Sequence, residues 1–157
     1  MKRMIIGLDL EKEYSQISYY SDRAGEPETV SIVENQDKYL IPTPEGLLRE
    51  RGKEKVRDLA EFIKSCISYL RPVTHMTDIF LMITMREIRQ PWIDWLHDAC
   101  QMLGMDRENV FLQSYQESFF YYVLNQKKEL WNHDAALFEY TQSGICSWLM
   151  KIDNRTR

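Results

Sequence analysis

The sequence predicts an α/β fold: a mixed sheet in which an antiparallel three-strand meander adjoins parallel strands, with helices on its faces. Three short strand-like runs follow one another near the N-terminus with only tight turns between them, which is typical of a meander. Further along, apolar runs of strand length alternate with apolar stripes of helical spacing. Since two parallel strands need a crossover, this alternation favours parallel pairing. The predicted order is β-β-β-α-β-α-β-α, then a β-hairpin.

The meander is expected at the N-terminus. Its three strands are Met4–Leu10, Tyr14–Ser21 and Thr29–Glu34. The first run is short and apolar, as a central strand would be, and the second alternates in side-chain character. The segment 35–52 carries several proline and glycine residues, so we expect an ordered loop with one short strand at Tyr39–Ile41.

Two helices are predicted from apolar stripes whose spacing matches the helical period. The first helix spans residues 53–70, and its stripe is Val56, Leu59, Ala60, Ile63, Cys66, Ile67 and Leu70. The second begins at Pro91, because proline is tolerated in the first turn of a helix. Its stripe is Trp92, Trp95, Leu96, Ala99, Met102 and Leu103. Gly104 is suited to a left-handed cap at the end of this helix.

The remaining elements complete the alternation. Asp78–Thr84 has the length and apolar character of a buried strand, and Asn109–Gln113 is a further short strand. Tyr115–Glu129 is expected to be a helix rich in aromatic residues, with Glu117 as a first-turn acid that favours the helix dipole. The last two strands form a predicted hairpin: Ala135–Tyr140 and Ile145–Ile152.

Composition argues against several classes of function. The 157 residues include 20 Lys and Arg against 24 Asp and Glu, a net charge of −4, so no nucleic-acid partner is expected. No apolar run reaches the length of a membrane span, so we expect a cytoplasmic location without membrane contact. Cys66, Cys100 and Cys146 form no CxxC pair and are expected to be small buried residues. The histidines are scattered, so no metal site is predicted.

The end of the first predicted strand, Gly7-Leu8-Asp9-Leu10, resembles the phosphate-loop motif of the superfamily of actin, sugar kinases and heat-shock chaperones. The order of elements resembles the ribonuclease-H-like first lobe of that superfamily, and Ala136–Glu139 resembles the start of its second phosphate loop. The chain is similar to a bacterial family of actin-like proteins with degenerate phosphate loops. This resemblance implies that residues 1–132 form a first lobe and residues 133–157 a hairpin that begins a second lobe.

The resemblance also implies a vestigial phosphate site at Asp9, Lys12, Ser15 and Glu139. Phosphate loops rely on glycines, because backbone N–H groups can then converge on an anion without obstruction by Cβ atoms. The corresponding positions here are Glu11, Lys12 and Glu13 in the first loop, and Thr141, Gln142 and Ser143 in the second. A carboxylate about 4 Å from a phosphate oxygen costs roughly 4 kcal/mol at an effective dielectric of about 20. Nucleotide hydrolysis is therefore not expected, and no residue is assigned a catalytic role.

Two hypotheses of function remain. The first is a non-catalytic scaffold or protein-interaction module without a cofactor, which contacts a protein partner or a second copy through the aromatic helix 115–129 and the hairpin 135–152. The aromatic run Phe119–Tyr122 also fits ordinary core packing. The alternative is the N-terminal part of an ATP-binding ATPase, in which the four site residues line the phosphate site and Asp9 helps to hold magnesium; otherwise Asp9 is a polar residue that ends a strand. A nuclease is disfavoured, because only Asp9 stands where metal-binding acids gather.

Overall fold

The computed structural model describes residues 4–20, 25–34, 36–49, 53–70, 75–127, 134–141 and 144–151. By their contacts, the residues divide into two compact units, which we call unit 1 (Met1–Gln113) and unit 2 (Ser114–Arg157). Each unit has its own sheet. The predicted boundary between residues 132 and 133 follows from the resemblance to a superfamily with two lobes, and it stays a prediction.

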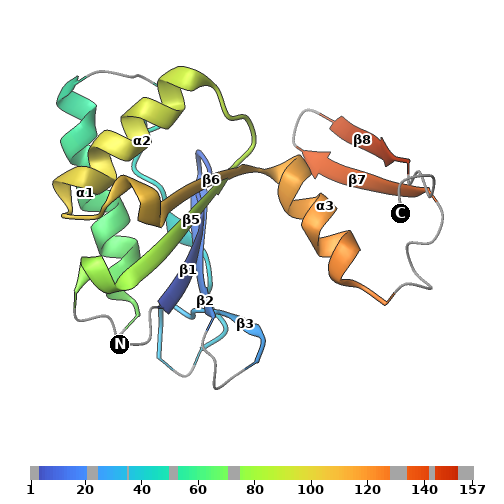
Figure 1. Ribbon diagram of the computed structural model, residues 1–157, viewed down its shortest axis with the longest axis horizontal. Helices are drawn as coiled ribbons and strands as arrows, with labels where there is room; N and C mark the ends of the chain where they lie inside the picture. The colour runs from blue at the N-terminus through green and yellow to red at the C-terminus, as the bar shows by residue number, and fades with distance from the viewer. Residues whose placement is uncertain are drawn as a thin grey trace. The chain divides into compact units, whose positions relative to one another are not determined.

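A mixed six-stranded sheet forms the centre of unit 1 (Figure 1). Its strands are β1 (Met4–Asp9), β2 (Tyr14–Tyr20), β3 (Pro27–Thr29), β4 (Ile41–Pro42), β5 (Ile79–Met85) and β6 (Val110–Ser114). The order is β3-β2-β1-β5-β6, and β4 also pairs with β2. β2 is antiparallel to β1 and to β3, whereas β5 is parallel to β1. The predicted meander and the predicted parallel pair are both confirmed.

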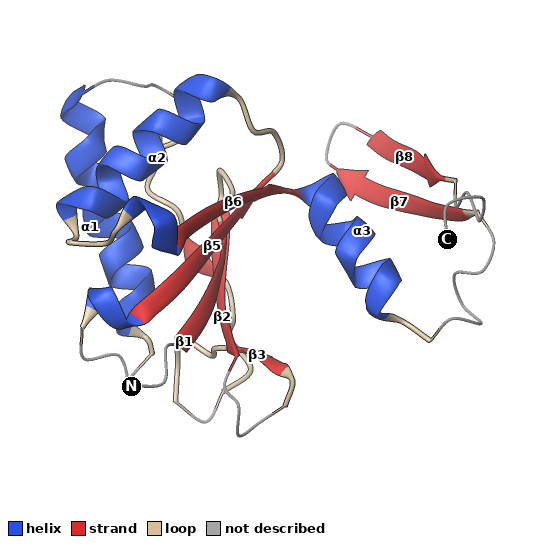
Figure 2. Cartoon of the chain, in the orientation of Figure 1, coloured by secondary structure: helices blue, strands red, loops and turns tan. Residues whose placement is uncertain are grey.

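Two helices pack on one face of this sheet (Figure 2). They are α1 (Lys53–Ser68), between β4 and β5, and α2 (Gln90–Met102), between β5 and β6. Short 3₁₀ turns at Met76–Asp78 and Arg107–Asn109 lead into β5 and β6. α1 therefore lies in the crossover connection that the parallel pairing of β1 with β5 requires.

The strands bury alternate side chains beneath α1 and α2, as the two-residue period of a strand requires. The buried residues of β5 are Ile79, Leu81, Ile83 and Met85. β1 adds Ile6 and Leu8 to the same face, because they lie opposite Leu81 and Ile83 in the parallel register. The buried residues of α1 are Leu59, Ala60, Phe62, Ile63, Cys66 and Ile67. All but Phe62 belong to the predicted stripe, whose first residue, Val56, is partly buried, so the helical spacing is confirmed.

The C-terminal cap of α2 is also confirmed. Gly104 takes a φ of 78°, in the left-handed region that favours glycine. Its N–H donates to the carbonyl of Gln101 at 2.9 Å, and the Met105 N–H donates to the carbonyl of Cys100 at 3.1 Å. These two bonds satisfy carbonyl groups that the end of a helix leaves without an intrahelical donor.

The third strand is shorter than predicted and begins earlier. The prediction placed it at Thr29–Glu34, but β3 ends at Thr29 and the chain then bends. The Ser31 hydroxyl lies within hydrogen-bonding reach of the carbonyl oxygens of Val33, Gln36 and Lys38. A side chain that bonds nearby backbone carbonyls competes with strand pairing, and this explains the bend.

Smaller corrections concern α2 and β4. The predicted buried stripe of α2 includes Met102, but its side chain is 58% exposed in the last turn of the helix. Cys100 is buried instead, since it lies one helical turn after the buried Leu96 and on the same side of the helix. β4 is Ile41–Pro42 rather than Tyr39–Ile41, and the buried Ile41 is common to both.

Unit 2 comprises a helix and a two-stranded hairpin. These elements are α3 (Tyr115–Asn125), β7 (Ala135–Thr141) and β8 (Gly144–Met150). The helix ends earlier than predicted, and the last predicted helical positions, 128–129, lie outside the described residues. Residue 152, the predicted end of the hairpin, also lies outside them. The predicted hairpin itself is confirmed, with Ala135 opposite Met150 and Thr141 opposite Gly144.

Ser114 and Glu117 cap the N-terminus of α3 reciprocally. The Glu117 N–H donates to the Ser114 hydroxyl oxygen at 3.2 Å, and the Ser114 N–H donates to the Glu117 carboxylate at 2.8 Å. Hydrogen bonds from the backbone N–H and then from the hydroxyl of Ser114 lower the pKa of the Glu117 carboxyl. The prediction that Glu117 is a first-turn acid of this helix is confirmed.

The cysteines differ in exposure, which corrects the expectation that all three are buried. Cys66 and Cys100 are buried in unit 1, whereas Cys146 is exposed on β8. A strand of a two-stranded sheet has few neighbours to cover its side chains, which accounts for the exposure of Cys146.

We expect one of the three thiols in the folded chain to react rapidly with Ellman's reagent. Burial raises the pKa of Cys66 and that of Cys100 to about 12, so both remain protonated near neutral pH. Replacing Cys146 with serine should remove the fast phase, and unfolding in urea should make all three thiols of the unsubstituted chain reactive. A second fast thiol in the folded chain would contradict the burial of unit 1.

Candidate functional site

The carboxyl ends of β1 and β5 meet at one edge of the sheet, where open α/β sheets bind their ligands. Asp9 is the last residue of β1, is half-buried, and lies in register with Thr84 of β5 and Gln16 of β2. The chain then turns through residues 10–13, and the Leu10 N–H donates to the Thr84 carbonyl at 2.8 Å. The turn between β1 and β2 therefore lies at the edge where the sequence predicted a phosphate site.

Glu11 occupies the position where the resembled motif has a glycine. Its Oε2 atom accepts a hydrogen bond from the Lys12 N–H at 3.2 Å, and its Oε1 atom lies 3.5 Å from Nε of Arg86. Among the described residues no hydrogen bond reaches Oε1, so its contact with Arg86 is an ion pair without a hydrogen bond. Both side chains are partly exposed, so the pair contributes little to stability, although it favours this position of the carboxylate.

Ser15 is completely buried near the start of β2. Its hydroxyl oxygen lies 2.9 Å from the hydroxyl oxygen of Thr43, which is also buried, and accepts a longer hydrogen bond of 3.4 Å from the Glu11 N–H. Buried polar groups are costly unless they are paired, so the two hydroxyls support each other. Ser15 thereby links the turn after β1 to the segment that follows β4.

The four predicted site residues do not all lie in one unit. Asp9, Lys12 and Ser15 belong to unit 1 and surround a single turn, with Lys12 exposed to solvent. Glu139 lies on β7 of unit 2, where it is half-buried and opposite Cys146. The participation of Glu139 in a site with the other three residues stays a prediction.

Sequence reasoning missed two residues of this turn. Arg86 follows directly after β5, and the parallel pairing of β1 with β5 brings their carboxyl ends to one edge. A search for charged residues just beyond each predicted parallel strand could have found Arg86. Thr43 is different, because it reaches Ser15 from 28 residues along the chain and no local pattern marks it.

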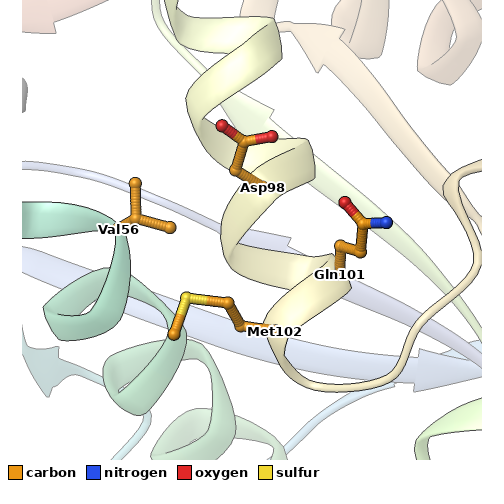
Figure 3. A pocket seen from close by; sticks show the side chains of 4 residues that line it. All are labelled: Val56, Asp98, Gln101 and Met102. Carbon is orange, nitrogen blue, oxygen red and sulfur yellow. The ribbon is translucent and has the colours of Figure 1, made fainter. Parts of the chain in front are cut away.

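A groove of about 410 Å³ lies elsewhere in unit 1, between α1 and α2 (Figure 3). It is lined by Val56 of α1 and by Asp98, Gln101 and Met102 of α2. Ligand pockets combine enclosure with several convergent polar groups. This groove opens widely to solvent and offers one carboxylate and one amide, so we do not regard it as the functional site.

The described residues contain neither a cluster of metal-binding side chains nor a membrane-spanning helix. No group of three or more His, Cys, Asp and Glu side chains is placed there to hold a metal ion. No helix in the described part of the chain is both long enough and apolar enough to cross a membrane.

Exposed aromatic residues gather in unit 2. In α3, Phe120, Tyr121 and Tyr122 are exposed, while Val123 is buried. These exposures do not fit the interpretation of the aromatic run as ordinary core packing. In the hairpin, large apolar side chains of β7 and β8 are also exposed. Exposed apolar surface of this kind is typical of a contact with another molecule.

The fold defines an α/β protein with a mixed sheet. In the turn after its first strand, the side chains of Ser15 and Glu11 accept hydrogen bonds from backbone N–H groups. The chain belongs to the family described as "Family of unknown function (DUF5716) C-terminal", which matches residues 47–157. The comparison with curated proteins finds no match. Among solved structures, a non-polymerising mutant of MamK bound to AMPPNP is weakly similar, with 10% sequence identity and a TM-score of 0.42. That similarity covers 72% of this chain, and the chain spans 41% of the MamK chain.

Proposed function

We propose that this chain is a non-catalytic protein-interaction module, built on an actin-like scaffold whose first phosphate loop is filled by its own side chains. One observation carries the proposal: two backbone N–H groups of the turn, those of Glu11 and Lys12, already have internal acceptors. The Glu11 N–H donates to Ser15, and the Lys12 N–H donates to the Glu11 carboxylate. A phosphate would need these same N–H groups.

The electrostatics of the turn support the same conclusion. A nucleotide phosphate placed near the Lys12 N–H would stand beside the Glu11 carboxylate, which accepts from that N–H. At about 4 Å and an effective dielectric of about 20, two like charges repel by roughly 4 kcal/mol before screening by salt. The side chains of Lys12 and Arg86 offset part of this repulsion, but Arg86 already lies near Glu11. The turn therefore favours its own carboxylate over an external anion.

An ATP-binding protein is the second candidate function, and one observation favours it. Asp9 is half-buried at the carboxyl ends of two parallel strands, where α/β sheets place ligands. This candidate requires Glu11 to leave the turn when nucleotide binds. It also requires the buried hydroxyl of Ser15 to turn away from Thr43 if Ser15 is to line the phosphate site.

Isothermal titration of the whole chain with ATP and Mg²⁺ tests the two candidates. We expect no saturable heat at micromolar nucleotide, because the turn lacks free N–H donors at residues 11 and 12. The Glu11→Gly variant is the informative companion, since it removes the carboxylate and leaves the Lys12 N–H available. Any binding should therefore be stronger in this variant than in the unsubstituted chain. Micromolar binding by the unsubstituted chain would refute the proposed function.

A further inference from the structure

The hairpin of unit 2 has one face that is apolar and exposed. The register pairs Ala136 with Leu149, Phe138 with Ser147 and Tyr140 with Ile145, and side chains directly opposite one another lie on the same face. We call these six residues the hairpin face. Its four large side chains are Phe138, Tyr140, Ile145 and Leu149, which are 59%, 80%, 64% and 62% exposed.

The opposite side of the hairpin is covered better. Leu137 and Trp148, which pair with each other across the two strands, are both half-buried. Glu139, the charged residue within β7, also lies on this opposite side, because side chains alternate along a strand. The large side chains of the hairpin face are therefore more exposed than Leu137 and Trp148, and none of its six residues is charged.

The size of the hairpin face suits a weak protein contact. At about 180 Å² for each large side chain, the four exposed residues present roughly 500 Å² of mainly apolar surface. A symmetric contact would then bury about 1,000 Å² in total, which is at the lower end for specific interfaces. A two-stranded hairpin is marginally stable alone in water, so covering this face also stabilises unit 2.

The chemistry of the hairpin face is self-complementary. It carries no formal charge, so two copies can meet without the like-charge repulsion that the net charge of −4 produces elsewhere on the chain. Its polar groups are the hydroxyls of Tyr140 and Ser147, and a hydroxyl can both donate and accept a hydrogen bond. In a twofold contact each residue meets the same surface on the other copy, so such groups can satisfy one another.

We propose that the hairpin face binds the hairpin face of a second copy of this chain, giving a weak, twofold-symmetric dimer. This inference rests on the proposed function, because it names the partner of the interaction module. Since the contact is apolar, its affinity should change little as salt increases, whereas a contact between charged surfaces would weaken. The dimer should form as concentration rises from the micromolar range.

Sedimentation velocity of the 157-residue chain over a series of concentrations tests this dimer. The unsubstituted chain should sediment faster as concentration rises. The Tyr140→Lys variant should associate more weakly by a factor of about ten or more, because an ammonium group would be buried without a partner. Tyr14→Lys is the matched control, since Tyr14 is half exposed on β2 of unit 1 and should leave association unchanged. Circular dichroism would check that both variants keep the fold.

Three outcomes would overturn the dimer: a monomer at every concentration, undiminished association of Tyr140→Lys, or equal weakening by Tyr14→Lys. Titration of the same preparations with ATP and Mg²⁺ separates this inference from the proposed function. Nucleotide binding with intact dimerisation would defeat the proposed function alone. A monomer that binds no nucleotide would defeat the dimer alone.

Discussion

Replacing Ile6 with alanine is expected to lower the free energy of unfolding of unit 1 by about 3 kcal/mol. Ile6 is completely buried at the centre of β1, opposite Leu81 of β5. The substitution removes three carbon atoms from the layer between the sheet and the helices. The cost combines the lost transfer of apolar surface with the cavity that remains, because a β-strand bonded on both sides cannot collapse to fill it.

Ile5 provides the matched control for this prediction. It neighbours Ile6 on the same strand but faces the other side of the sheet, where it is 47% exposed. Ile5→Ala should therefore cost about 1 kcal/mol or less. Urea unfolding followed by tryptophan fluorescence gives both values, and replacing Trp131 and Trp148 with phenylalanine restricts the signal to Trp92 and Trp95 of unit 1. Equal costs at the two positions would show that the buried face has been assigned to the wrong side of β1.

The elements that sequence reasoning predicted best are those with one buried face. The apolar stripe of α1 and the apolar run of β5 were visible in the sequence, because each element buries one face in the core of unit 1. The loop after β3 was wrongly predicted as a strand. Strand pairing fails there because the Ser31 side chain bonds a carbonyl as far as seven residues away. Periodicity cannot register such bonds, since they depend on the path of the backbone.

The candidate site was predictable only in part, for a related reason. A motif at the end of β1 led to Asp9 and to the unusual Glu11, because both lie in one short stretch of sequence. The residues that complete the turn, Arg86 and Thr43, come from distant parts of the chain. Their role depends on pairing between strands, which a sequence indicates only after the topology is known.

Replacing Ser15 with alanine is expected to lower the free energy of unfolding of unit 1 by about 1 to 3 kcal/mol. The substitution removes one partner of a buried hydroxyl pair and leaves the Thr43 hydroxyl without it. Ser18→Ala is the matched control on the same strand, because the hydrogen bond from the Ser18 hydroxyl to the Gly7 carbonyl is long and weak, at 3.5 Å. This control should change stability by about 0.5 kcal/mol or less.

A double substitution separates a structural role of Ser15 from a role in binding phosphate. When both hydroxyls are replaced, in Ser15→Ala with Thr43→Val, no buried hydroxyl of the pair is left unsatisfied, so the joint cost should be smaller than the sum of the two single costs. Urea unfolding of the four chains measures this coupling. Costs that simply add would show that the hydroxyls of Ser15 and Thr43 do not support each other in the folded chain, and would leave the Ser15 hydroxyl available for an external anion.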